Sequence, residues 1–256
     1  MELEYEKEGR IAIFTLNRPE ALNALSPNLF QELHDAFEDF KTDSELWVGI
    51  VTGSGEKAFC AGADIKLWLP FVKECKSKPW LLPTTPLRGM QLWKPLIAAV
   101  NGLAMGGGLE LALCCDLRIA SEKARFGFPE ARLGLLPRLG GTVRLPRTIP
   151  WAKAVEMLFF GKPIDAQEAY RIGLVNKVVE SDQVMGTARE WAEGLCKVAP
   201  LAVRAIKEAI VKGEALSIED ALWIENALGL PLYETEDYEE GRAAFREKRE
   251  PVFKGK

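Results

Sequence analysis

Residues 101–120 have the sequence NGLAMGGGLELALCCDLRIA, and this stretch decides the fold class. The apolar run PLIAAV at 95–100 precedes it and is typical of a buried strand. Within the stretch, LELALC at 109–114 predicts a helix and DLRIA at 116–120 predicts another strand. Three glycines, Gly106–Gly108, open the helix. A strand, a glycine turn, a helix and a further strand in this order predict a mixed α/β body.

The segments on either side extend this prediction. Residues 2–16 alternate as a β-hairpin, residues 28–41 have helical periodicity, and WVGIVTG at 47–53 is typical of a buried strand. From about Asp182 only helical patterns follow, at residues 183–197, 201–212, 218–228 and 236–248. Ser217 and Thr235 are expected to cap the last two helices. A helical tail without a large core of its own is expected to pack on a neighbour.

Composition and charge exclude several classes of protein. The 256 residues carry 33 basic and 37 acidic side chains, so no global positive field predicts binding to nucleic acid or to a membrane surface. No apolar run reaches the roughly 18 residues that a transmembrane helix needs. The first residues, MELEYEKEGR, resemble neither a secretory signal nor a transit peptide. We therefore expect a cytoplasmic protein without a nucleic-acid or membrane partner.

Few side chains are available for catalysis. The single histidine, His34, lies in a helical pattern and is expected near the surface, which excludes a histidine-rich metal site. The five cysteines are irregularly spaced and form no C-x-x-C pair, so buried, reduced thiols are expected. Proton transfer near neutral pH would then depend on carboxylates, Lys, Cys or Tyr.

The triple glycine predicts a site for a negative charge. N–H groups at the start of a helix point outward at the positive end of the helix dipole, and glycine leaves them uncovered. Ala61–Ala63 could supply another donor, Glu110 falls in the first turn of the helix, and Glu130 follows a proline in a turn. In the structural alternative, the glycines allow close packing, Glu110 complements the helix dipole and Glu130 is a surface acid. The residues alone leave both interpretations open.

Other glycine-dependent motifs are missing. The sequence has no G-x-x-x-x-G-K-[ST], and Gly106–Gly108 lacks the third glycine of G-x-G-x-x-G. It also has no G-x-S-x-G nucleophile elbow. Nucleotide hydrolysis and α/β-hydrolase chemistry are therefore poorly supported.

An ordered set of motifs resembles the enoyl-CoA hydratase/isomerase (crotonase) family along nearly the whole chain. These motifs are NRPEALNAL at 17–25, AFCAGADIK at 58–66, the glycine stretch quoted above, FGFPEARLGLLP at 126–137, GGTVRLPR at 140–147 and TEDYEEGRAAFREKR at 235–249. The resemblance implies a spiral of repeated ββα units, expected at residues 1–198. It also implies a helical region, expected at residues 199–256, that builds trimers, commonly paired into hexamers.

The same resemblance implies the site. The N–H groups of Ala63 and Gly107 would form an oxyanion hole for a thioester carbonyl, and Glu110 and Glu130 would be the catalytic glutamates. The residues implied to lie along coenzyme A are Ala24, Ala61, Ala63, Asp64, Ile65 and Lys66, with Phe245 and Lys248 reaching the nucleotide of a neighbouring subunit.

The implied activity is that of an enoyl-CoA hydratase, a hydro-lyase that adds water to an enoyl-CoA thioester and gives a 3-hydroxyacyl-CoA. One glutamate would activate water for attack at Cβ, and the other would hold that water and supply a proton at Cα. Two close carboxyl groups are expected to titrate as a coupled pair with one pKa raised. Coenzyme A is part of the substrate, so neither a separate cofactor nor a metal is expected.

Alternatives within the family are an enoyl-CoA isomerase, an acyl-CoA hydrolase and, further away, a non-catalytic RNA-binding protein. The presence of both glutamates favours a hydratase, since isomerases of the family typically lack the first.

The chain departs from the family pattern after Pro137, where many relatives have small residues and this chain has Arg138 and Leu139. A bulky cation at the acyl end puts a plain crotonyl substrate in doubt. Arg138 is expected either to meet a carboxylate or ring oxygen of the substrate or to pair with an acid such as one in residues 234–240. The segment Leu67–Trp93, rich in Trp, Leu, Phe and Pro, corresponds to a region that lines the acyl pocket in relatives; ordinary packing is the alternative.

Overall fold

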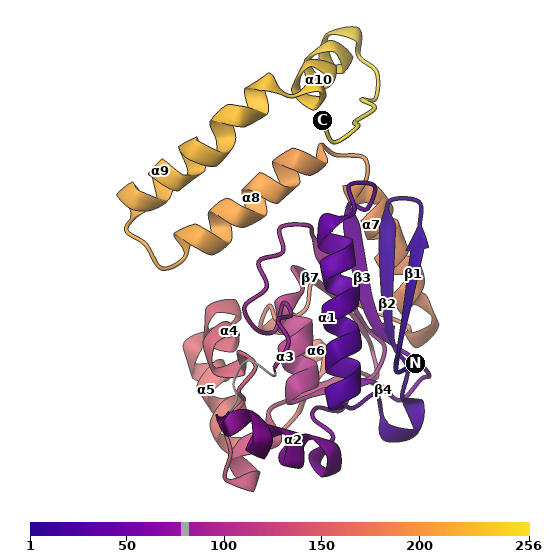
Figure 1. Ribbon diagram of the computed structural model, residues 1–256, viewed down its shortest axis with the longest axis vertical. Helices are drawn as coiled ribbons and strands as arrows, with labels where there is room; N and C mark the ends of the chain where they lie inside the picture. The colour runs from indigo at the N-terminus through magenta and orange to yellow at the C-terminus, as the bar shows by residue number, and fades with distance from the viewer. Residues whose placement is uncertain (78–81) are drawn as a thin grey trace.

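A computed structural model describes residues 1–77 and 82–256 of the chain (Figure 1). Its first sheet has the strand order β1 (Leu3–Glu8), β2 (Ile11–Leu16), β3 (Val48–Gly53), β5 (Leu96–Val100), β7 (Leu117–Ser121) and β10 (Lys177–Val179). β1 and β2 form the predicted antiparallel hairpin, and every other pair in this sheet is parallel. The second sheet has the order β4 (Ala58–Cys60), β6 (Leu103–Met105), β8 (Arg125–Gly127) and β9 (Ile164–Asp165).

A ββα unit recurs along the described chain and generates the spiral. The units are β3–β4–α2 (α2, Ile65–Ser77), β5–β6–α3 (α3, Gly107–Cys114) and β7–β8–α4 (α4, Gly141–Thr148). In each unit the first strand joins the first sheet and the second strand joins the second sheet. This confirms the predicted crotonase-type α/β body.

Helices cover both faces of the first sheet. On one face, α1 (Pro27–Thr42) packs Phe37 against Phe14 of β2 with ring centroids 4.5 Å apart. On the other face, α7 (Val184–Leu195) packs on β3, β5 and β7, and its Ala188 and Ala192 share a buried cluster with the alternate β2 residues Ile11 and Ile13. Strands buried on both faces must be apolar throughout, which is why β2, β3 and β5 consist almost entirely of apolar residues.

The remaining helices of the body are α5 (Trp151–Phe160) and α6 (Ala166–Arg171). Asp165 caps α6, because its Oδ1 accepts the Glu168 N–H at 2.9 Å. All five cysteines are free thiols; Cys60, Cys75 and Cys115 are buried and the other two are half-buried, as expected. His34 is half-buried on α1, with Nδ1 2.5 Å from the Thr84 carbonyl oxygen. None of the described helices is long and apolar enough to cross a membrane.

The C-terminal helices leave the body and project beyond it (Figure 1). They are α8 (Pro200–Gly213), α9 (Ile218–Gly229) and α10 (Glu236–Glu247). Their predicted caps are confirmed: Ser217 Oγ accepts the Asp220 N–H and Thr235 Oγ1 accepts the Tyr238 N–H, both at 3.1 Å. The expected boundary after residue 198 falls in the connection between α7 and α8.

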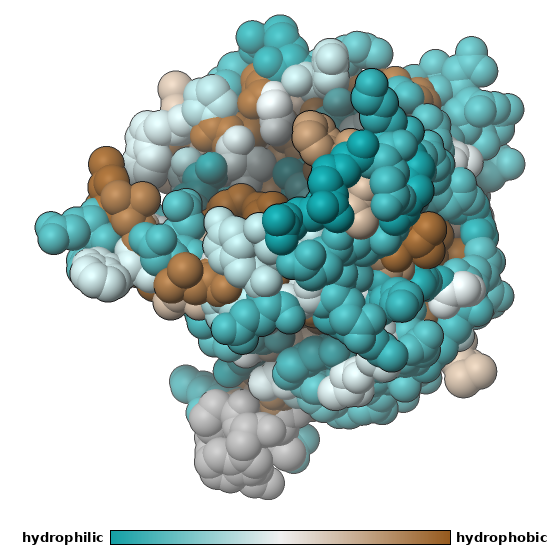
Figure 2. Space-filling model, turned by 90° about the horizontal axis from the view of Figure 1, so that it is seen from above, coloured by the Kyte–Doolittle hydropathy of each residue, from teal (hydrophilic) through white to brown (hydrophobic). Residues whose placement is uncertain are grey.

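This helical unit exposes many large apolar side chains. Figure 2, which looks down on this end of the molecule, shows brown apolar residues between teal hydrophilic ones. Those exposed on α8, α9 and α10 include Ile206, Ile210, Ile218, Trp223 and Phe245. Trp223 is 72% exposed and Phe245 is 86% exposed, so the unit does not bury its own apolar surface.

Candidate active site

Two backbone N–H groups lie side by side without an acceptor. Gly107 is the first residue of α3, so no preceding helical turn accepts its N–H. Ala63 forms an isolated parallel β-bridge with Leu25. The hydrogen bonds of this bridge come from the residues on either side of Ala63: the Leu25 N–H donates to Gly62 O at 2.7 Å, and the Asp64 N–H donates to Leu25 O at 2.9 Å. The Ala63 N–H therefore points away from the bridge, and neither amide meets an acceptor in the described chain. A Cβ built on Gly107 would lie 3.7 Å from Ala63 N, so one anion can reach both donors.

The glycines are required both by packing and by access. Gly106 has φ of +51°, and a Cβ there would lie 2.6 Å from Oε1 of Glu130. A Cβ on Gly108 would lie 2.0 Å from the Cys60 carbonyl oxygen. The glycines thus let α3 begin tightly against β4, and they also let a carboxyl group lie directly beside the open amides. The packing interpretation of the triple glycine is therefore confirmed, and the open amides leave the predicted anion site sterically accessible.

Glu110 is buried and held by a loop. The side chain lies in the first turn of α3, as predicted, and is 2% exposed. Its Oε1 accepts the N–H groups of Leu139 and Gly141, each at 2.7 Å. Burial raises the pKa of Glu110 above its usual value, and the two N–H donors offset only part of that rise. The carboxyl group is therefore fixed in position by the loop.

Glu130 has a different environment. It lies on the 3₁₀ helix Pro129–Leu133, directly after β8. Burial, with a contribution from the Glu110 charge, raises the pKa of Glu130 to about 7. Its buried Oε2 has no hydrogen-bond partner among residues 1–77 and 82–256. A buried polar atom of this kind usually meets water or a ligand, so Glu130 is placed to exchange a proton with a bound molecule.

A buried arginine fixes the segment that carries Ala63. Arg18 is 9% exposed and donates from Nη1 to Ala24 O at 2.6 Å and from Nη2 to Asp64 Oδ2 at 3.0 Å. Its Nε lies 3.2 Å from Glu2 Oε1. The guanidinium therefore clamps residues 22–25 to residues 61–64, the two segments that orient the free amide of Ala63. The Arg18 charge also holds the pKa of the Asp64 carboxyl below its usual value.

Asn23 completes the clamp. Its side chain is fully buried, accepts the Arg18 N–H and donates to the carbonyl oxygens of Ser54 and Ala58. Leu22 and Asn23 both have positive φ, 52° and 55°, which the side-chain hydrogen bonds of Asn23 stabilise. Sequence reasoning did not identify Arg18 or Asn23 as functional, nor the two amides that bind Glu110. The motif NRPEALNAL contained the signal, because a polar residue within an apolar segment needs internal partners.

The predicted coenzyme A residues separate into two groups. Ala24, Ala61, Ala63 and Asp64 lie together at the paired segments, and Ile65 and Lys66 follow, exposed, at the start of α2. Phe245 and Lys248 lie on and just after α10, in the helical unit at the opposite end of the protomer (Figure 1). One protomer therefore does not bring these two residues to Glu110.

Arg138 and Leu139 occupy different positions in the same loop. Leu139 is half-buried, and its Cδ1 would lie 3.7 Å from a Cβ on Gly107, so it contacts the region of the free amides. Arg138 is exposed and makes no ion pair with any acid in the described chain. The expected alternative pairing with residues 234–240 is therefore not observed. In the segment Leu67–Trp93, Leu87 and Leu92 are buried in the core, and residues 78–81 lie outside the described residues.

A ββα spiral that presents two open amides beside one buried and one half-buried carboxyl group has the parts of a site that binds an anion and exchanges protons. The family model described as "Enoyl-CoA hydratase/isomerase" matches residues 6–256, and the chain belongs to this family.

Curated relatives and solved structures agree with this membership. The chain is 44% identical to "(E)-benzylidenesuccinyl-CoA hydratase" of Thauera aromatica, over 100% of both chains. It is 45% identical to "Short-chain-enoyl-CoA hydratase" of Clostridium acetobutylicum, over 95% of this chain and 94% of that one. The crystal structure of an enoyl-CoA hydratase from Bacillus anthracis superposes with a TM-score of 0.94 at 39% identity, covering 100% of each chain.

Proposed function

We propose that this protein is an enoyl-CoA hydratase that adds water reversibly across the α,β double bond of an enoyl-CoA thioester. The observation that carries the proposal is the convergence of Glu110 and Glu130 beside the open amides of Ala63 and Gly107. Relatives named as hydratases at 44% and 45% identity support it. An isomerase needs one carboxyl group to move a proton, whereas two carboxyl groups with different environments suit the addition of water.

The thioester carbonyl binds between the N–H groups of Ala63 and Gly107, which stabilise negative charge as the enolate forms. Glu110, whose hydrogen bonds favour the carboxylate, takes a proton from water as the water oxygen bonds to Cβ. Glu130, whose pKa is about 7, gives its proton to Cα as the double bond is lost. Glu110 then returns its proton through solvent and Glu130 is protonated again. Neither step transfers an electron, and coenzyme A enters as part of the substrate, so no separate cofactor takes part.

Coenzyme A lies along the clamped segments in this proposal. The backbone at Ala24 and Ala61 borders the free amides, and Ile65 and Lys66 are exposed at the start of α2 beyond them. Asp64 serves the site differently from the other residues, since its carboxylate is bound by Arg18. The enzyme acts in the cytoplasm in this proposal.

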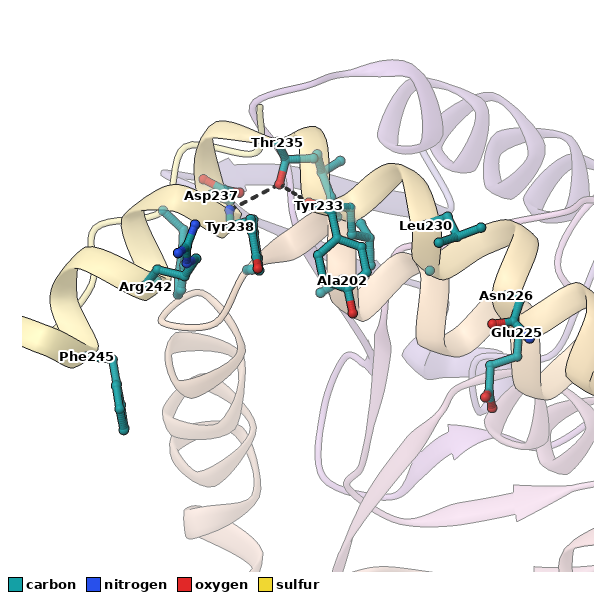
Figure 3. A pocket seen from close by; sticks show the side chains of 16 residues that line it. Ala202, Glu225, Asn226, Leu230, Tyr233, Thr235, Asp237, Tyr238, Arg242 and Phe245 are labelled. Atoms are coloured by element: carbon teal, nitrogen blue, oxygen red, sulfur yellow. Dashed lines mark hydrogen bonds between the residues drawn. The ribbon is translucent and has the colours of Figure 1, made fainter.

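The helical unit assembles trimers, which commonly pair into hexamers in this family. A cavity of about 740 Å³ lies between α8, α9 and α10, lined by Tyr233, Tyr238 and Phe245 among others. Figure 3 shows Phe245 pointing away from its helix and Tyr233 beside Ala202 of α8. Apolar surface of this extent is covered in solution by further copies of the chain. Phe245 and Lys248 then reach the nucleotide of a neighbouring subunit.

Substitution of the two glutamates tests the proposed chemistry. Glu110→Gln and Glu130→Gln keep the shape of each side chain but remove its acid–base function. Each is expected to lower the hydration of crotonyl-CoA by about 100-fold or more. The measurement is the loss of enoyl absorbance in steady state, with circular dichroism as the control for folding. Near-wild-type turnover in either folded variant would remove that residue from the mechanism.

A further inference from the structure

The loop at residues 137–141 joins the proposed site to a neighbouring cavity of about 540 Å³. One side of the loop is fixed because the N–H groups of Leu139 and Gly141 bind Glu110. The other side is fixed because Arg144 donates to Leu139 O at 2.9 Å. Leu139 also lines the cavity and lies beside Gly107. Leu139 is therefore shared between this cavity and the surroundings of the free amides.

The cavity combines apolar walls with positive charge. Leu87, Leu136 and Pro137 supply apolar surface, and three arginines line the cavity against one glutamate. Two of these arginines have partners: Arg144 donates to the carbonyl oxygens of Leu139 and Pro86, and Arg147 pairs with Glu214 at 3.3 Å. Arg138 has no hydrogen-bond or ion-pair partner in residues 1–77 and 82–256. Of the three arginines that line the cavity, Arg138 therefore has a guanidinium that is free to bind a ligand beside the apolar walls.

Arg138 lies next in sequence to a residue that holds the proposed catalytic carboxyl group. Residue 138 directly precedes the amide that holds Glu110. An extended arginine side chain reaches roughly 7 Å from its Cα. An anionic group a few bonds beyond Cβ of a bound acyl chain therefore falls within reach of Arg138. Arginine binds carboxylates through two parallel N–H···O bonds, which gives both affinity and orientation.

We propose that Arg138 binds a carboxylate at the far end of the acyl group, so that the preferred substrates are CoA half-thioesters of unsaturated dicarboxylic acids. This inference rests on the hydratase function proposed above and adds the substrate class. The phosphates of coenzyme A are the other anions that an arginine here can bind. They are present in every acyl-CoA, so two substrates that differ only at the acyl terminus separate the two sources of charge.

The test compares glutaconyl-CoA, its neutral terminal methyl ester and crotonyl-CoA in the wild type, Arg138→Gln and Arg147→Gln. The wild type is expected to prefer the acid over the ester in kcat/KM. Arg138→Gln should lower this preference roughly tenfold or more, the scale of a charge-assisted hydrogen bond. Arg147→Gln removes the same charge from the same cavity and is the matched control, whose acid-to-ester preference should stay near that of the wild type.

Several outcomes would overturn the inference. An unchanged acid-to-ester preference in Arg138→Gln does so, as does an equal loss in both variants, which would point to the general charge of the cavity. An equal loss on all three substrates would place Arg138 on coenzyme A or in the fold. A wild type that hydrates crotonyl-CoA without preferring the acid contradicts only this inference, whereas a wild type that hydrates none of the three contradicts the proposed function.

A measurement on the wild type alone covers the case in which Arg138→Gln does not fold. Saturated glutaryl-CoA and its terminal methyl ester compete with crotonyl-CoA but cannot be hydrated. Glutaryl-CoA is expected to have the inhibition constant that is lower by roughly tenfold or more, and the difference should shrink as salt is added. Equal inhibition constants would contradict carboxylate binding at this site.

Discussion

Among single residues, Glu130 has the environment that most clearly predicts how hydration depends on pH. Because its pKa is raised to about 7, the group is largely protonated below that pH and loses its proton above it. Hydration needs that proton at Cα, so kcat/KM for hydration, which reports the pKa values of the free enzyme, is expected to fall as pH rises through about 7. The measurement is the pH profile of kcat/KM with crotonyl-CoA. A hydration rate that stays flat from pH 6 to pH 9 would contradict the role of Glu130 as the acid.

The same carboxyl group affects stability. In the folded state its pKa is raised from 4.5 to about 7, so between these values the folded protein binds more protons than the unfolded chain. Protonated Glu130 therefore stabilises the folded state relative to ionised Glu130. This contribution to the free energy of unfolding is fully present below about pH 4.5 and is lost as pH rises through 7. The amide in Glu130→Gln does not titrate. The free energy of unfolding of this variant should therefore rise relative to that of the wild type from pH 5 to pH 8. Partial exposure limits the gain to the order of 1 kcal/mol.

Urea unfolding at several pH values measures this effect. The control is Glu122→Gln, which changes an exposed glutamate in a turn. Its stability difference from the wild type should not change over the same range. If Glu130→Gln and the wild type keep a constant difference, the carboxyl group has an ordinary pKa and the site is wetter than its burial implies.

Individual residues also show which parts of the site could be predicted from the sequence and which could not. The residues that begin α3 could be predicted, because glycine and an acid at a helix start have a local meaning. The support of Glu110 by Leu139 and Gly141 could not, since these residues lie 29 and 31 positions away in the sequence and no local pattern connects them. The absence of an ion pair at Arg138 likewise depends on the packing of the whole loop.

At the scale of elements, hydrophobic periodicity was sufficient for α1, for the buried strands β3, β5 and β7 and for α7 to α10. The ββα repeat was expected only from the resemblance to the family, because its second strands β4, β6 and β8 are three residues long and carry no periodic signal. Hydrophobic periodicity failed to reveal how segments 22–25 and 61–64 pair, because they form an isolated bridge rather than regular strands. The pairing depends on Arg18 and Asn23, which are buried polar residues with several partners each. Interactions of this kind are specified by tertiary contacts and leave no periodic signal.

The clamp between these segments leads to a prediction about Arg18. Arg18→Lys keeps the charge but cannot reach Ala24 O and the Asp64 carboxylate in the same fork, and Arg18→Met removes both contacts. Both variants should let the Ala63 amide move from its place beside Gly107. Misplaced oxyanion donors lower kcat more than they change KM, and a loss of roughly tenfold to 100-fold is expected, larger for Met.

An infrared measurement separates this positioning role from a general loss of fold. The carbonyl stretch of bound ¹³C-labelled butyryl-CoA reports how strongly the two amides polarise it. The band should move towards that of free thioester in Arg18→Met and by less in Arg18→Lys. Lys7→Met, which removes the surface pairs with Asp39 and Asp43, is the control and should keep the wild-type band. A wild-type band in folded Arg18→Met would show that Arg18 only stabilises the fold.

At the scale of the whole molecule, the C-terminal segment ties the helical unit to the body. Asp237 is buried and accepts the N–H groups of Lys254 and Gly255, at 2.6 and 2.9 Å. Arg10 of the body donates to Phe253 O at 3.3 Å and lies over the ring of Trp47. The unit is also tied to the body along α8, where Lys207 pairs with Asp116 at 2.8 Å, while large apolar side chains of α8 and α9 remain exposed.

This arrangement predicts an oligomer rather than a free protomer. Sedimentation velocity at micromolar concentration is expected to give a trimer or a hexamer. Trp223→Glu places a charge on an exposed apolar position of α9 and should shift the protein towards smaller species. Glu219→Gln, at the start of the same helix, is the control and should leave the assembly unchanged. A monodisperse wild-type monomer would contradict the assembly and leave Phe245 and Lys248 without a role at the site.

Mixed oligomers test whether one subunit completes the site of another. Phe245→Ala/Lys248→Ala is expected to raise KM for crotonyl-CoA in every site, because coenzyme A loses contacts that do not change during reaction. Glu110→Gln inactivates each site but keeps an intact α10. When the two chains are coexpressed with different tags and purified through both, sites with an intact Glu110 can receive α10 from a Glu110→Gln neighbour. Those sites should recover the wild-type KM. If the mixed oligomers only show the raised KM of the double variant, then Phe245 and Lys248 do not reach a neighbouring site, and the position of α10 at the far end of the protomer has another cause.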